Sequence, residues 1–111
     1  MVQQFKVSAT ATNIKTKDGV TVVRYHETDV VKFNTEYIAL RTGGWDTKTT
    51  KTRWVQASSQ FDLKYSVQIK DGDWFLSYAG KSYIITHPEN EDCLIVIDRN
   101  TDEVIGSVIA A

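Results

Sequence analysis

Hydrophobic and polar residues alternate with a period of two over most of the chain, and this period is typical of strands with one buried face. From Phe5 to Ala11 every second residue is apolar. Three further apolar or β-branched runs follow at 20–25, 30–33 and 37–40, separated by turn-forming residues such as Lys17-Asp18-Gly19. We therefore predict an antiparallel meander over about residues 5–41.

The period changes to that of a helix between about residues 47 and 61. The predicted packed face comprises Thr50, Trp54, Ala57, Ser58 and Phe61. The opposite, solvent-facing side comprises Lys48, Thr52, Arg53, Gln56 and Gln60. Asp46 or Thr47 can cap the start by accepting hydrogen bonds from free backbone N–H groups. Because several threonines lower the helix propensity, we expect Trp54 and Phe61 to hold the helix by packing onto the sheet.

Strands resume after the helix and form a second predicted meander over about residues 63–110. Asp71-Gly72 and Ala79-Gly80-Lys81 are its turn signals. The predicted strands lie at 63–69, 74–78, 82–86, 93–98 and 103–110. The whole pattern predicts one α+β domain over residues 1–111, mostly antiparallel sheet in meanders, with one central helix packed on it.

The composition fits this single globular domain. Of the 111 residues, 41% are hydrophobic and 24% are charged, a balance that argues against disorder. The single cysteine, Cys93, cannot form an internal disulfide. We expect no membrane association, because no apolar run approaches the roughly 20 residues of a membrane helix. The first residues also lack the apolar stretch of a signal peptide.

The net charge of −1 hides an uneven distribution. Residues 1–70 carry 11 cations and 6 acids, a balance of 11 − 6 = +5. Residues 71–111 carry 2 cations and 8 acids, a balance of 2 − 8 = −6. Either the strands of the two halves interleave and mix these charges, or one surface is basic and another is acidic.

Motifs of nucleotide binding, metal binding and catalysis are missing from the sequence. It contains no phosphate-binding glycine loop of either common type. His26, His87 and Cys93 have no metal-ligand spacing, and Cys93 begins an apolar strand. We therefore expect no catalytic residue, no metal site, no cofactor and no enzymatic activity. An enzyme without a recognisable motif is a further alternative, because triads assemble from residues distant in sequence.

The stretch from Thr42 to Trp54 holds the candidate binding residues. It places three cations at the start of the predicted helix, where they oppose the helix dipole. The candidates for partner binding are Gly43, Gly44, Trp45, Lys48, Lys51, Arg53 and Gln56. A protein partner would use Trp45 as an anchor and the cations for complementarity. A nucleic acid would use the same cations on phosphates, although the net negative charge counts against it. Alternatively, Trp45 covers the core edge and the cations form a solvated face.

The same stretch resembles a family of small, uncharacterised proteins of tailed bacteriophages. The resemblance extends over roughly residues 23–76. Its most distinctive part reads Thr42-Gly43-Gly44-Trp45, Thr47, Thr49-Thr50-Lys51, Arg53, Gln56-Ala57-Ser58 and Gln60-Phe61. Trp54 and Val55 depart from the asparagine and methionine that are usual there, and residues 62–64 lack a common glycine. The resemblance implies a phage accessory protein in the cytoplasm of the infected bacterial host, and it implies no substrate or cofactor.

The leading hypothesis is therefore a small, non-enzymatic phage accessory protein that binds a host or viral protein through the turn and helix start at 43–53. A nucleic-acid-binding module that uses the same basic surface is the alternative. Exposed strand edges also make a homodimer joined through the sheet an option.

Overall fold

The computed structural model describes residues 12–25, 28–42, 48–86 and 93–111. The strands before the helix are β1 (Thr12–Lys17), β2 (Val20–Tyr25), β3 (Thr28–Phe33) and β4 (Tyr37–Arg41). The helix is α1 (Lys48–Phe61). The strands after it are β5 (Ser66–Lys70), β6 (Asp73–Tyr78), β7 (Lys81–Ile85), β8 (Leu94–Asp98), β9 (Val104–Gly106) and β10 (Val108–Ala110). The strand predicted at 5–11 and the caps Asp46 and Thr47 lie outside the described residues.

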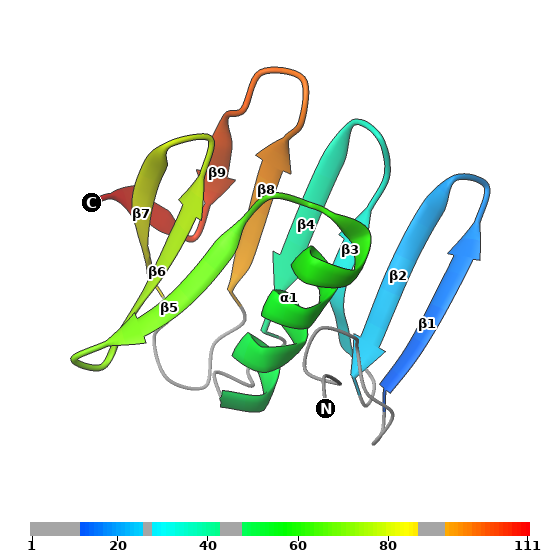
Figure 1. Cartoon of the computed structure of the whole chain (residues 1–111), viewed down its shortest axis with the longest axis horizontal. Helices are drawn as coiled ribbons and strands as arrows, with labels where there is room; N and C mark the ends of the chain where they lie inside the picture. Colours follow the sequence, from blue (N-terminus) through cyan, green and yellow to red (C-terminus); the bar gives the residue numbers. More distant parts are fainter. Residues whose placement is uncertain (1–11, 26–27, 43–47, 87–92) are drawn as a thin grey trace.

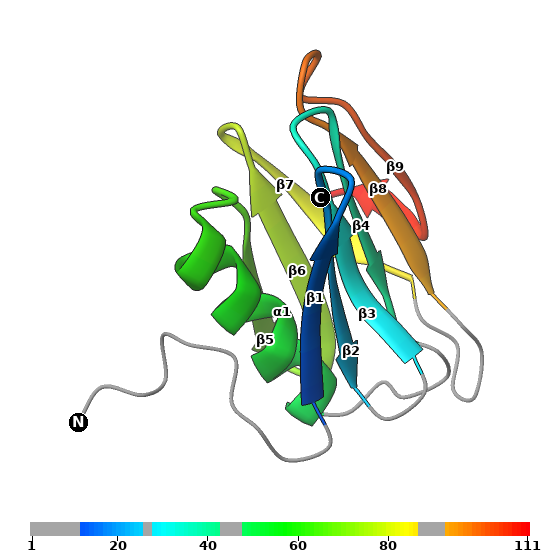
Figure 2. The same cartoon turned by 90° about the vertical axis from the view of Figure 1, so that its right-hand side faces the viewer.

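The strands form two antiparallel sheets. The larger sheet has the order β1-β2-β3-β4-β8-β9, and the smaller has the order β10-β7-β6-β5. The helix α1 and the smaller sheet both lie over the same face of the six-stranded sheet (Figures 1 and 2). The predicted α+β class, antiparallel sheet and packed helix are confirmed, and β1 to β4 form the first predicted meander. The second predicted meander is interrupted after β7, because β8 pairs with β4 and β10 pairs with β7. The division of the strands between two sheets is a feature that the sequence pattern did not indicate.

The predicted hairpin turns have the backbone conformation that their residues favour. Asp18 and Gly19 have φ values of 53° and 80°, and Asp71 and Gly72 have 53° and 83°. Paired positive φ values are typical of the type I′ turn, whose twist matches that of the flanking strands. Each of these two-residue turns therefore fixes the register of its hairpin, as the pairings Lys17↔Val20 and Lys70↔Asp73 show.

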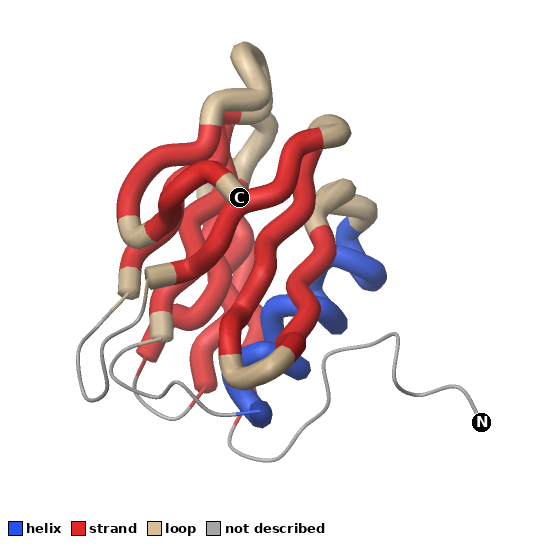
Figure 3. The backbone as a smooth tube through the Cα atoms, turned by 90° about the vertical axis from the view of Figure 1, so that its left-hand side faces the viewer, coloured by secondary structure: helices blue, strands red, loops and turns tan. Residues whose placement is uncertain are grey.

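The strand predicted at 103–110 is in fact two strands that belong to different sheets. Gly106 ends β9 with a φ of 105°, and a Cβ there would collide with the carbonyl oxygen of Leu94. Ser107 then joins the sheets: its N–H donates to Leu94 O at 2.8 Å, and its carbonyl accepts from Thr86 N at 2.8 Å. Glycine is needed here because no other residue fits both the conformation and the close approach. The C-terminal strand consequently lies in the four-stranded sheet (Figure 3).

The core lies between the six-stranded sheet and the layer made of α1 and the smaller sheet. Fully buried residues include Ile38, Ile95 and Ile97 from the larger sheet and Leu76 from the smaller. The predicted helix face is confirmed, because Thr50, Trp54, Ala57 and Ser58 are buried and Phe61 is half-buried. The Phe61 ring packs on Phe33 with a centroid distance of 5.0 Å.

Trp54 joins the helix to both sheets. The pairing of β2 with β3 shifts register between Val23 and Arg24, an irregularity that leaves one residue outside the ladder. The Trp54 indole Nε1–H donates to Val30 O at 2.9 Å in this region. On the other side, the Trp54 ring meets Trp74 edge to face, with a centroid distance of 5.7 Å. The Tyr65 hydroxyl donates to Trp54 O, and Ser58 Oγ donates to Tyr65 O at 2.6 Å. The helix is thus held in place by hydrogen bonds as well as by packing.

Candidate functional site

The structure distributes the predicted binding residues between several environments. Gly43, Gly44 and Trp45 lie outside the described residues, and Lys48 is the first residue of α1. Lys51 is half-buried. Arg53 and Gln56, which the sequence pattern placed on the solvent-facing side, are instead buried. That part of the sequence prediction is wrong.

Arg53 is a packing residue because its guanidinium stacks on an aromatic ring. Its side chain lies over Tyr25 in β2, 5.4 Å from the ring centroid, which is within the range of a cation–π interaction. Arg53 Nη1 also donates to Gln56 Oε1 at 3.2 Å, one helical turn further along. The flank of α1 next to Trp54 therefore faces β2, and the buried part of the helix is wider than the apolar residues alone predict.

The other face of the six-stranded sheet, here called the open face, is covered by no described helix or strand (Figure 2). Strand pairing aligns one residue from each strand in a row across the middle of this face. The row reads Lys15, Val22, Lys32, Ala39, Val96 and Ile105. Apolar side chains therefore stand beside lysines on a surface open to solvent.

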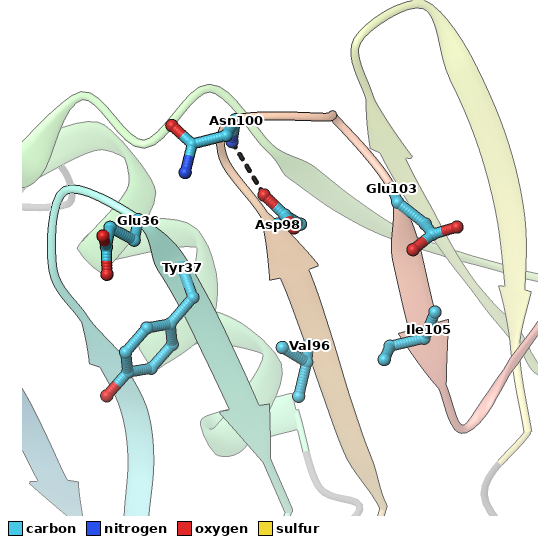
Figure 4. A pocket seen from close by; sticks show the side chains of 7 residues that line it. All are labelled: Glu36, Tyr37, Val96, Asp98, Asn100, Glu103 and Ile105. Atoms are coloured by element: carbon cyan, nitrogen blue, oxygen red, sulfur yellow. Dashed lines mark hydrogen bonds between the residues drawn. The ribbon is translucent and has the colours of Figure 1, made fainter.

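One end of the open face, at β4, β8 and β9, is hollowed. The hollow has a volume of about 360 Å³ and is lined by Glu36, Tyr37, Val96, Asp98, Asn100, Glu103 and Ile105. Tyr37, Val96 and Ile105 project from three adjacent strands, while the acids stand nearer the strand ends (Figure 4). We call Glu36, Asp98 and Glu103 the acidic end.

The turns beside the acidic end are fixed by hydrogen bonds. Asp98 Oδ1 accepts from the backbone N–H groups of Asn100 at 2.9 Å and Thr101 at 3.2 Å. Arg99 Nη1 donates to Asn34 O at 2.7 Å, and Asn34 Oδ1 accepts from the Glu36 backbone N–H at 2.7 Å. These bonds connect the β3–β4 turn to the β8–β9 turn, so the rim of the hollow is preorganised.

The opposite end of the open face carries cations. A second hollow, of about 290 Å³, is lined by Asn13, Lys15, Val22, Arg24 and Asp29. Arg24 Nε donates to Asp29 Oδ1 at 2.8 Å. Lys17 lies on the same side as Lys15, because Thr16 between them points the other way and contacts the buried Thr21. We call Lys15, Lys17, Arg24 and Lys32 the basic end.

The uneven charge of the sequence is therefore reproduced across the open face. The basic end comes from residues 1–70 and has one acid beside it, Asp29, whereas two of the three acids of the acidic end come from residues 71–111. Residue types alone did not identify this surface, since its residues are scattered over six strands and two turns. The charge asymmetry was the sequence signal that pointed to it.

The pKa shifts that the structure produces belong to the interior. Burial raises the pKa of the Tyr65 hydroxyl above its ordinary value. Burial also raises the pKa of Tyr78, with a further increase from the nearby Asp102 carboxylate. Neither tyrosine lines the two hollows. In the described part of the chain, no group of three or more His, Cys, Asp or Glu side chains is arranged to hold a metal ion. No helix within the described residues is long and apolar enough to cross a membrane.

These features define a two-layer α+β protein with one covered and one open face on its larger sheet. The chain matches the family described as Kyanoviridae Gp96 protein over residues 1–95. It therefore belongs to this family and is a phage protein. The match extends beyond residues 23–76, where the resemblance to phage proteins was found in the sequence. Comparison with curated proteins and with solved structures gave no match.

Proposed function

We propose that this phage protein acts without catalysis, by binding another protein in the cytoplasm of the infected host, and that the open face is its contact surface. The observation that carries the proposal is the hollow at the acidic end. There Tyr37, Val96 and Ile105 form an apolar floor beside a rim of carboxylates. Protein interfaces commonly combine an apolar centre, aromatic residues included, with a polar rim.

The exposure of the floor supports this role. Ile105 is 54% exposed and Leu94, which also points to the open face, is 45% exposed. Single exposed apolar residues are ordinary on protein surfaces, but here Ile105 lies directly opposite Val96, and Leu94 lies two residues before Val96 on the same face of β8. A contiguous apolar patch with a charged rim is a feature of interaction surfaces.

The helix start is the alternative contact surface for the same function. Burial of Arg53 and Gln56 removes two of its predicted contact residues. Its remaining candidates are the described Lys51, together with Gly43, Gly44, Trp45 and Lys48. A nucleic-acid partner is the alternative class of ligand, and the basic end would then provide its phosphate contacts.

A capture experiment with matched isoleucine variants tests the proposal. Ile105 and Ile109 are both 54% exposed, but Ile105 lies on the open face and Ile109 on the four-stranded sheet. Tagged Ile105→Glu should recover at least about tenfold less partner from infected cells than the unmodified protein, since a buried unpaired charge is costly at an interface. Tagged Ile109→Glu should recover the same amount as the unmodified protein.

Two further results of the capture would contradict the proposal. If Ile105→Glu retains the partner and a Trp45→Ala, Lys51→Glu variant loses it, the helix start is the contact surface. If nuclease treatment abolishes recovery, and binding falls steeply with salt, the ligand is a nucleic acid.

A further inference from the structure

We propose that the open face binds a second copy of this chain, in a face-to-face dimer whose two-fold axis runs parallel to the strands. The inference rests on the proposed function in one respect, that the open face is a binding surface, and it names an occupant of that surface. Three properties of the open face carry it: the order of the strands, the levels at which apolar and charged residues lie, and the area.

Strand order determines which parts of two copies meet. The axis lies between β3 and β4, the central strands of the order β1-β2-β3-β4-β8-β9. Rotation about it places β1 of one copy over β9 of the other, and β2 over β8. Residues at one level along the strands stay at that level. Each copy thus presents the same surface to the other, as a two-fold interface requires.

Apolar residues then face each other on either side of the axis, one strand away from the central pair β3 and β4. Val22 in β2 and Val96 in β8 belong to the same cross-strand row. The rotation therefore brings Val22 of one copy over Val96 of the other, twice in the dimer. Both side chains are half-buried already, and the second copy would complete their burial.

Opposite charges face each other at the edges. Lys17 pairs with Val20 at the β1–β2 turn. Tyr37 pairs with Asp98, whose backbone N–H donates to Glu103 O at 2.8 Å. The pairing of Thr21 with Phe33 puts Val20 level with Asn34, the residue that follows β3. The Asn34 backbone N–H donates to Tyr37 O at 3.0 Å, so the two levels are the same. Lys17 and Glu103 therefore lie at the same level on opposite edges, and the rotation places each over the other.

The alternative two-fold axis, perpendicular to the strands, is disfavoured by the same charges. That axis places β1 over β1 and β9 over β9. With the axis at the level of the cross-strand row, Lys15 and Lys32 of one copy would face Lys15 and Lys32 of the other. Like charges at an interface are repulsive and exclude wrong pairings, so the charge pattern selects the axis parallel to the strands.

The area of the open face is sufficient for a weak dimer. Six strands spaced about 4.8 Å apart, with about five residues each, cover roughly 500 Å² per copy. Two copies would bury about 1,000 Å², at the lower limit for specific interfaces. We therefore expect a dimer with a dissociation constant in the micromolar range, and one that weakens as salt screens its charge pairs.

Sedimentation equilibrium over a series of micromolar concentrations tests the inference through a charge exchange. Lys17→Glu and Glu103→Lys should each raise the dissociation constant by about tenfold, because each creates two like-charge pairs across the interface. The double variant, Lys17→Glu with Glu103→Lys, should restore the dimer because the pairs become attractive again. Lys81→Glu in the four-stranded sheet is the matched control and should leave the dissociation constant unchanged.

The outcomes that overturn the inference differ from those that overturn the proposed function. A monomer at every concentration in low salt excludes the second copy, yet it leaves capture of another protein by the open face intact. A dimer that both single variants leave unchanged is joined elsewhere, for example through a strand edge. A double variant that fails to restore the dimer, while both single variants weaken it, shows that Lys17 and Glu103 do not meet. Circular dichroism of each variant shows whether it is folded.

Discussion

The two faces of the six-stranded sheet arise from the same two-residue alternation, but one face is buried and the other is open to solvent. On the inner face, Val23, Ile38 and Ile95 are fully buried beneath α1 and the smaller sheet. On the open face, Val96 and Ile105 stand among lysines and acids, and no described element covers them. Apolar residues on the inner face are accounted for by folding. Folding does not bury the apolar residues of the open face, and these residues therefore mark a surface that is available to a binding partner.

Replacement of Trp54 gives the largest expected effect and tests the inner side of the comparison. Trp54→Ala should lower the free energy of unfolding by about 3–5 kcal/mol, because it leaves a cavity under the helix and an unsatisfied Val30 carbonyl. Chemical denaturation measures the loss. Trp54→Phe keeps an aromatic ring, and its free energy of unfolding should lie between those of the parent and of Trp54→Ala. A Trp54→Ala protein with the stability of the parent would show that α1 does not depend on this contact.

Replacement of Arg53 tests whether this cation contributes to packing, unlike the other cations of the helix start. Arg53→Ala should lower the free energy of unfolding by about 1–3 kcal/mol, because it removes the stack on Tyr25 and the hydrogen bond to Gln56. Lys51→Ala, in the same helix, is the control and should change stability by less than about 0.5 kcal/mol. Equal losses from the two variants in a denaturation series would contradict the packing role of Arg53.

Alkaline pH provides a test of the interior that needs no mutation. Burial raises the pKa of Tyr65 from its ordinary value of 10.0, so the folded protein keeps this proton where the unfolded chain releases it. The unfolded state then binds fewer protons, and stability falls as pH rises above about 10, by up to about 1.4 kcal/mol per pH unit. Denaturation at several pH values measures the slope. Tyr65→Phe should make the loss of stability with rising pH shallower. If the slope is unchanged in this variant, groups other than Tyr65 cause the pH dependence.

The sequence predicted local structure well where short-range patterns decide it. The helix bounds, the hairpin at Asp71-Gly72 and the packed face with Trp54 follow from periodicity and turn chemistry. The partition into two sheets does not follow, because it depends on the change of sheet at Gly106 and on pairing between β4 and β8, whose partners lie 94 − 41 = 53 or more residues apart. Distant pairing has no local signature.

The candidate site was harder to predict than the fold. The helical spacing of the apolar residues puts Arg53 on the solvent-facing side, yet the flank of α1 meets an aromatic ring of β2. The open face is assembled from residues of both halves of the chain. The net charges of +5 for residues 1–70 and −6 for residues 71–111 indicated an uneven charge distribution. Only the strand order shows that these charges lie at opposite ends of one surface.

The smallest expected effect on stability is that of Ile105→Glu, and it tests the open side of the comparison. Because Ile105 is already 54% exposed, its replacement should change the free energy of unfolding by no more than about 0.5 kcal/mol. The same change should reduce the recovery of a protein partner from infected cells, since a carboxylate added to the acidic end repels its neighbours and cannot enter an apolar contact. Ile109→Glu has equal exposure and should be neutral in both measurements. Thermal melts of the two variants should coincide with the parent. If Ile105→Glu instead unfolds the protein, Ile105 belongs to the core, and the open face has less apolar surface available for a partner than we infer.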